Sequence, residues 1–216
     1  MAKSDLENWK RANNLRLTIL AKLKETGGDY TPQIWTDNPI FNFCNTSGGL
    51  DELGFKIIEI PEIFWKEWEG FDDGYKSEVA IIIANPQESA KCLSDIHYHE
   101  GDVIITGLGE TYGFKNPQTT FFRGKLEANT FLDKSSVVTL DAYPFGDNTI
   151  IPIQSLEPHG TFVKPNTVTV FLAVTCGQRF NNDGDVDATK IKPERCVVSG
   201  LHQQSSSLIE YIKVLS

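Results

Sequence analysis

Short runs of β-forming residues recur from about position 55 onward, and this rhythm limits the fold more than any other feature of the sequence. Turn-forming residues such as Asp72-Asp73-Gly74 and Asn116-Pro117 separate the runs, as they do in antiparallel sandwiches and barrels. The predicted strands are Phe55 to Ile60, Val79 to Ala84, Val103 to Thr106, Thr119 to Phe122, Val137 to Leu140, Thr149 to Ile153 and Val168 to Val174. The sequence therefore predicts a mainly β fold.

The segment before these strands has a different pattern. Ser4 and Glu7 fit a capping box, and apolar residues then recur at helical spacing as far as Gly27-Gly28. This spacing predicts an amphipathic helix that packs on the main domain, followed by an irregular connection. A helix with a free apolar face could instead bind a second copy, so a homodimer stays open.

The expected organisation has three parts. Residues 1–53 form the helix and connection, residues 54–180 form the β domain, and residues 181–216 form a C-terminal extension. Within the extension, the segment from Ser207 to Leu215 fits a strand or a helix equally well.

Charge and composition exclude some partners. The 216 residues include 29 acidic and 20 basic side chains, a net charge of -9, which works against nonspecific binding to nucleic acid or anionic membranes. No signal peptide core and no bilayer-spanning apolar run is present. We therefore expect a cytoplasmic protein with a small-molecule partner, and neither a nucleic-acid nor a membrane partner.

Two histidines one residue apart are the strongest chemical signal. His97 and His99 precede Asp102 and the predicted strand from Val103. Side chains alternate along a strand, so the two imidazoles should project from the same face, close enough to share one metal ion.

These histidines, together with His159, resemble the motifs of the cupin superfamily, whose small jelly-roll barrels often hold a metal. The first motif combines H-x-H with an acidic residue and a glycine seven positions later, as in His97, His99, Asp102 and Gly109. The second motif is matched by Gly146, Pro152 and His159 in that order. The resemblance covers about Val79 to Val174 and implies a cupin-like jelly-roll β-barrel that binds one metal ion through His97, His99 and His159.

The fourth ligand has two candidates. Asp102 has the glycine spacing of the family motif, and Gly101 gives the chain a place to bend the carboxylate toward the histidines. Glu100 also has a glycine seven residues later, but in a regular strand it should point away from His99. We predict Asp102 as the ligand and keep Glu100 as the alternative.

Three imidazoles and one carboxylate suit a divalent transition metal, with Fe(II) favoured and Mn, Ni or Zn as alternatives. With Fe(II), the resemblance implies a dioxygenase that acts on a small organic substrate. With Mn or Zn, the same ligands could support a sugar isomerase or lyase, in which Glu110 or Glu157 could act as the base, although exposure at the surface is the more usual state of such residues. A noncatalytic binding or structural cupin is the alternative from a different class.

Three further residues are candidates for contacts with the substrate. Tyr98 and Tyr112 could form part of an apolar wall around the metal, and Arg123 could hold a carboxylate or phosphate. The competing expectation is that the aromatic side chains fill the barrel core and that Arg123 faces solvent.

Overall fold

The computed structural model describes most of the β domain and the C-terminal part of the chain. Beyond isolated positions between Lys10 and Ala21, the described residues are 55–59, 76–84, 86–99, 102–107, 119–124, 137–146, 149–167, 169–178, 189–200 and 203–216. The predicted connection before position 54 lies outside these residues, as does most of the predicted N-terminal helix.

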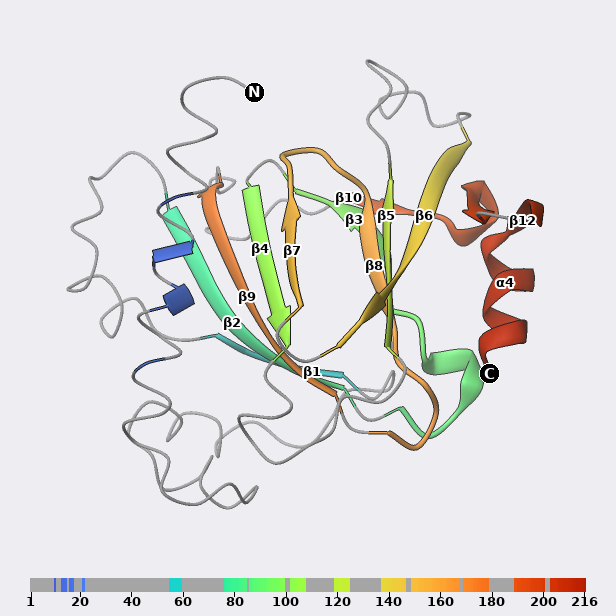
Figure 1. Ribbon diagram of the computed structural model, residues 1–216, viewed down its shortest axis with the longest axis horizontal. Helices are drawn as coiled ribbons and strands as arrows, with labels where there is room; N and C mark the ends of the chain where they lie inside the picture. Colours follow the sequence, from blue (N-terminus) through green and yellow to red (C-terminus); the bar gives the residue numbers. More distant parts are fainter. Residues whose placement is uncertain are drawn as a thin grey trace.

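Two sheets face each other (Figure 1). The first sheet has the order β1-β2-β9-β4-β7, and its strands are β1 (Phe55–Glu59), β2 (Lys76–Ala84), β9 (Thr169–Gln178), β4 (Asp102–Gly107) and β7 (Ile150–Ile153). The second sheet has the order β10-β3-β8-β5-β6-β11-β12. Its strands are β10 (Thr189–Ile191), β3 (Ile96–Tyr98), β8 (His159–Phe162), β5 (Thr119–Gly124), β6 (Val138–Phe145), β11 (Cys196–Gly200) and β12 (Gln203–Ser207).

The order of strands β2 to β9 is that of a jelly roll. Four antiparallel pairs are nested inside one another in the sequence: β5 with β6, β4 with β7, β3 with β8, and β2 with β9. When this nested ribbon rolls up, β9 pairs with β4 and β8 pairs with β5, which completes the two sheets. This order confirms the predicted jelly-roll fold, an arrangement of eight strands in two sheets.

The seven predicted strands are all present, with ends that differ by a few residues. The list of predicted strands did not include β3, β8, β10, β11 or β12. The last three of these strands come from the segment expected to be an extension, and they widen the second sheet beyond β6 and β3.

The space between the sheets holds an apolar inner core. Its buried members come from both sheets, and they are Val103, Ile105, Phe121, Phe145, Ile151, Ile153 and Phe171. A hydrogen bond of 3.0 Å between the hydroxyls of Thr119 and Thr169 also links β5 to β9 across the two sheets. The inner core fixes how the sheets lie relative to each other.

A second cluster lies on the outer face of the second sheet, which we call the outer cluster. It consists of Cys92, Ile96, Phe122, Val138, Leu140, Phe162, Ile191, Cys196, Val198 and Leu208. Helix α4 (Leu208–Leu215) covers this face (Figure 1) and contributes Leu208, Tyr211 and Ile212 to the contact. The short helices η2 (Ser89–Lys91) and η4 (Pro193–Arg195) directly precede two members of the cluster, Cys92 and Cys196.

The C-terminal segment divides at Ser207. This residue ends β12 and caps α4, because its hydroxyl accepts a hydrogen bond from the backbone N–H of Glu210. The segment that fitted both a strand and a helix is therefore a helix from Leu208 onward.

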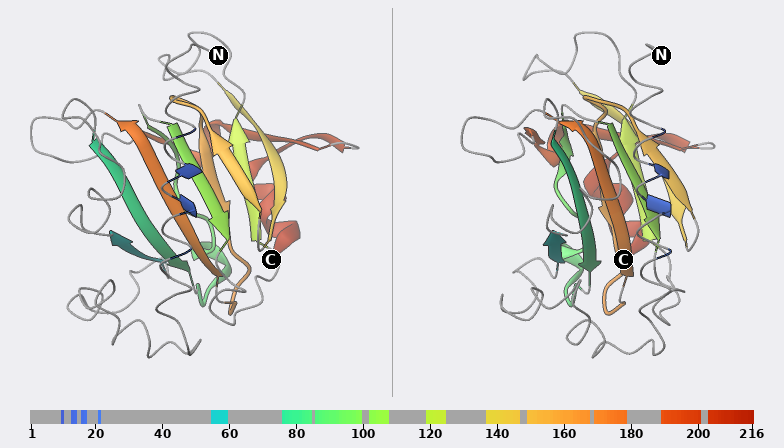
Figure 2. Two further views of the ribbon diagram at one scale, coloured as in Figure 1. Left: turned by 60° about the vertical axis from the view of Figure 1, so that its left-hand side comes forward. Right: turned by 90° about the vertical axis from the view of Figure 1, so that its left-hand side faces the viewer.

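Part of the outer face of the first sheet, along β9, is also buried. Val170, Leu172 and Val174 of β9 are fully buried and alternate with Phe171 of the inner core. The few described positions between 10 and 21 lie beside this face (Figures 1 and 2). Among the described residues, no helix combines the length and the apolar character that crossing a membrane requires.

Candidate metal site

The three predicted histidines meet on the inner face of the second sheet. His97 lies on β3 and pairs directly with His159, the first residue of β8. Directly paired residues of antiparallel strands point to the same side, and so do residues two apart on one strand, which places His99 with them. The ring of His159 stacks on Phe121 of the inner core with a centroid distance of 6.2 Å, so this side is the barrel interior.

The imidazoles are close enough to bind one ion. Their ring centroids are 4.6 Å apart for His97 and His99, 4.4 Å for His97 and His159, and 5.0 Å for His99 and His159. One ligand nitrogen from each ring lies within 4.8 Å of the other two. Histidine nitrogens bind transition metals at about 2.0–2.1 Å, so neighbouring ligand atoms in such a site are about 3 Å apart or more.

Backbone carbonyls fix the orientation of two of the rings. The Nδ1 atom of His97 lies 2.8 Å from the carbonyl oxygen of Asp95, and that of His159 lies 2.8 Å from the carbonyl oxygen of Glu157. A carbonyl only accepts hydrogen bonds, so both Nδ1 atoms carry the proton and both Nε2 atoms keep a free lone pair in the neutral ring. Metal-binding histidines are commonly held in this way.

His99, which lies two residues after His97 and just past the end of β3, completes the group. Its Nε2 atom lies 3.1 Å from Nε2 of His97, and its Nδ1 atom is buried without a hydrogen-bond partner among the described residues. Two ring nitrogens that face each other at this distance are satisfied when one donates a proton or when both bind the same cation. The residues therefore fit a divalent metal ion.

The surroundings keep all three imidazoles neutral, the form that binds metal. Burial, followed by the neighbouring charge of His97, lowers the pKa of His99 to about 3. Burial is also the largest cause that lowers the pKa of His97 and of His159, and it outweighs the opposing effect of their carbonyl partners.

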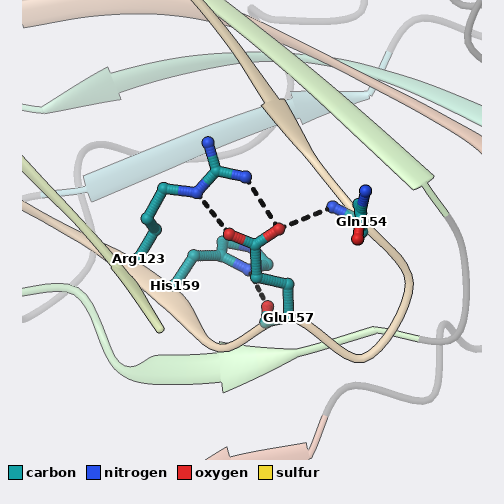
Figure 3. Close-up of polar contacts among 4 residues, drawn as sticks. All are labelled: Arg123, Gln154, Glu157 and His159. Carbon is teal, nitrogen blue, oxygen red and sulfur yellow. Dashed lines mark hydrogen bonds and ion pairs between the residues drawn. The ribbon is translucent and has the colours of Figure 1, made fainter. Parts of the chain in front are cut away.

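An ion pair lies directly beside the histidines. Arg123 of β5 pairs in register with His159 of β8, and its guanidinium binds the carboxylate of Glu157 through two nitrogens (Figure 3). Glu157 is only 5% exposed, so the expectation of a solvent-exposed glutamate is wrong for this residue. The Glu157 hydrogen bond is also the largest cause that raises the pKa of Arg123.

The other predicted residues do not join this group in the described part of the chain. Asp102 begins β4 in the opposite sheet, where it pairs with Cys176, but its side chain is not described, and Glu100 and Tyr112 lie outside the described residues. Asp102 as a ligand therefore stays a prediction. Tyr98 packs against the outer cluster and so lies on the other face of β3.

Comparison with protein-family models gives no match, and comparison with curated proteins gives none either. Among solved structures, similar folds occur in oxalate decarboxylase from Lactobacillus farciminis in a formate complex (10% identity, TM-score 0.43, 68% of this chain and 34% of that chain). They also occur in a cupin-2 domain protein from Rhodospirillum rubrum (11% identity, TM-score 0.36, 59% and 63%) and in Peruvianin-I, a cysteine peptidase from Thevetia peruviana latex (9% identity, TM-score 0.45, 69% and 74%). The chain spans about a third of the length of the oxalate decarboxylase.

Proposed function

We propose that this protein is a metal-dependent enzyme of the cupin type, in which His97, His99 and His159 hold one Fe(II) ion for a dioxygenase reaction on a small organic substrate. The observation that carries the proposal is the meeting of three neutral imidazoles inside the barrel, with ligand nitrogens within 4.8 Å of one another. When bound, the iron would supply positions for a substrate and for dioxygen.

The surroundings of the histidines suit such a reaction. Phe121 stacks on His159, and the inner core behind it is apolar, so the described walls exclude water from this side of the site. In a dioxygenase reaction both oxygen atoms of O₂ enter the substrate, which supplies all four electrons, so the protein needs no site for a separate reductant.

The environment of Glu157 favours a dioxygenase over an isomerase or lyase. An isomerase or lyase needs a base that can accept a proton from the substrate. Glu157 is buried and occupied by Arg123 and by the backbone N–H of Gln154, so it is poorly suited to that role. Glu110, the other candidate base, lies outside the described residues.

The test begins with protein purified without oxygen, stripped of metal and loaded with Fe(II). We expect about one iron per chain by elemental analysis, and dioxygen uptake with at least one compound from a panel of small acids, phenols and thiols. His97→Ala and His159→Ala should lose both properties, whereas His202→Ala, which removes the fourth histidine of the sequence, should keep them.

Three results would contradict the proposal. Full iron occupancy in both His97→Ala and His159→Ala would show that the metal does not bind at these residues. Stoichiometric metal without dioxygen uptake would favour an isomerase or lyase, and wild-type protein without bound metal would favour a noncatalytic binding protein.

A further inference from the structure

The turn between β7 and β8 contacts two of the three histidines. The backbone N–H of Leu156 donates a hydrogen bond of 2.7 Å to the carbonyl oxygen of His99, and the carbonyl oxygen of Glu157 accepts one of 2.8 Å from His159. A further bond, from Glu157 N–H to the carbonyl of Gln154, closes the turn itself. Residues 154–157 therefore link the end of β3 to the start of β8.

The side chain of Glu157 holds this turn in place. One carboxylate oxygen accepts hydrogen bonds from Nη2 of Arg123 at 2.8 Å and from the backbone N–H of Gln154 at 2.9 Å, and the other oxygen accepts from Nε of Arg123. Figure 3 shows the guanidinium and the amide converging on this carboxylate. A buried carboxylate that loses its cationic partner is strongly unfavourable, so the turn is held by charge as well as by backbone bonds.

Glu157 thus takes part in both the ion pair and the histidine site. Its side chain binds Arg123, and its main chain binds the ring of His159. Arg123 can reach it because Arg123 and His159 are direct partners on β5 and β8. The hydrogen bonds of the carboxylate therefore restrain the same residue whose carbonyl orients His159.

We propose that the Arg123–Glu157 ion pair is a positioning device for the metal site, which holds the Glu157 carbonyl against Nδ1 of His159 so that Nε2 faces His97 and His99. The inference rests on the proposed metal site. Arg123 and Glu157 are positioning residues in this role, and Arg123 is not available as a bidentate clamp for a substrate carboxylate while it binds Glu157.

The expected effect follows from the strength of such supporting contacts. Residues that orient metal ligands typically contribute about 10- to 100-fold to metal affinity. Glu157→Gln keeps an acceptor for Gln154 but loses the charge that binds Arg123, so we expect a loss of affinity in this range. Arg123→Lys keeps the charge but cannot form two parallel hydrogen bonds, so its loss should be smaller.

The experiment measures Zn(II) binding to the metal-free full chain by competition with a chromophoric chelator. The matched control is Glu88→Gln, which removes an exposed ion pair with Lys91 and should leave the affinity unchanged. In the same metal-free samples, ¹⁵N NMR of the imidazoles reports which nitrogen of His159 carries the proton. We expect Nδ1–H in the wild-type protein and in Glu88→Gln, and a mixture with Nε2–H in Glu157→Gln and, to a smaller extent, in Arg123→Lys.

The two readouts separate this inference from the proposed function. If the wild-type chain binds no zinc, the proposed metal site is wrong. The tautomer of His159 in the metal-free variants would still show whether the ion pair orients this ring. Unchanged affinity and an unchanged tautomer in Glu157→Gln and Arg123→Lys would overturn the inference. If Glu157→Gln does not fold, as judged by circular dichroism, the milder Arg123→Lys variant decides it alone.

Discussion

The two faces of the second sheet carry opposite kinds of side chain on the same strands. On β3, His97 faces the barrel, whereas Ile96 and Tyr98 belong to the outer cluster or pack against it. On β5, Phe121 lies in the inner core beside His159, whereas Phe122 lies in the outer cluster. The pleat of each strand therefore separates a face that carries the three histidines from a face that packs in the outer cluster.

This separation predicts whether a substitution should change stability or metal affinity. The outer cluster is apolar and fully packed, so changes there should lower stability and leave the metal affinity of the folded protein unchanged. The inner face near the histidines includes buried polar groups, whose burial opposes folding unless they are satisfied. Changes there should alter metal binding and the dependence of stability on pH.

Removal of a large, fully buried side chain of the outer cluster should have the largest effect. Phe122 is fully buried between the sheet and α4, where its ring lies 6.1 Å from that of Tyr211. Truncation of such a residue to alanine costs about 3–5 kcal/mol, and we expect this loss in the free energy of unfolding of Phe122→Ala, measured with urea. Zinc affinity of the folded variant should match the wild type, and a loss as large as that of His97→Ala would break the separation of the two faces.

Acid should destabilise the metal-free protein through the inner face. The pKa of His99 is lowered from 6.5 to about 3, so between these values the unfolded chain binds a proton there that the folded chain does not. Stability is therefore fully present above about pH 6.5 and falls as the pH drops toward about 3. At about 1.4 kcal/mol per pKa unit, the loss from His99 between about pH 7 and pH 4 is about 3 kcal/mol.

Urea unfolding of metal-free protein across this pH range measures the loss. His99→Gln removes the group and should flatten the profile, and bound zinc should also oppose the loss because it competes with protons for the same nitrogens. An equally steep profile in metal-free His99→Gln would assign the acid sensitivity to other groups.

A smaller cost is expected where the two strands of the site approach most closely. A Cβ atom added at Gly160 would lie 2.5 Å from Cδ1 of Ile96 and 3.3 Å from the carbonyl oxygen of Asp95. Overpacking of this kind costs about 1–3 kcal/mol, so Gly160→Ala should lower the unfolding free energy by about that amount. Ile96→Val removes Cδ1, and a double variant that recovers none of the loss would locate the strain elsewhere.

The smallest effect should come from the turn that holds the histidines. Leu156 has a φ of 64°, a left-handed conformation that costs an L-residue about 1–2 kcal/mol. Glycine removes this cost but loses about 0.5–1 kcal/mol more conformational entropy on folding, so Leu156→Gly should gain at most about 1.5 kcal/mol. Leu156→Ala, which keeps the strain, should not gain, and differential scanning calorimetry can compare the two.

Much of the fold was predictable from local patterns. The alternation of β-forming residues located all seven predicted strands, and the spacing of His97 and His99 placed both on one face. The same alternation assigns Tyr98, which lies between them, to the opposite face, so this signal was present in the sequence. In contrast, β8 contains Gly160 and follows Pro158, and β12 is Gln-Gln-Ser-Ser-Ser. Gly160, Pro158 and the Gln and Ser residues of β12 do not favour strands, so the local signal is weak at both places and pairing with neighbouring strands makes them strands.

The sequence by itself determined the period of the strands, and with it which residues of one strand share a face, because the pleat is a local property of the backbone. Only the tertiary structure decided that His159 lies opposite His97, that Glu157 is buried, and that Arg123 binds it. These depend on which distant strands pair when the ribbon rolls up, and that choice is made by burial of the whole inner core rather than by neighbours in the chain.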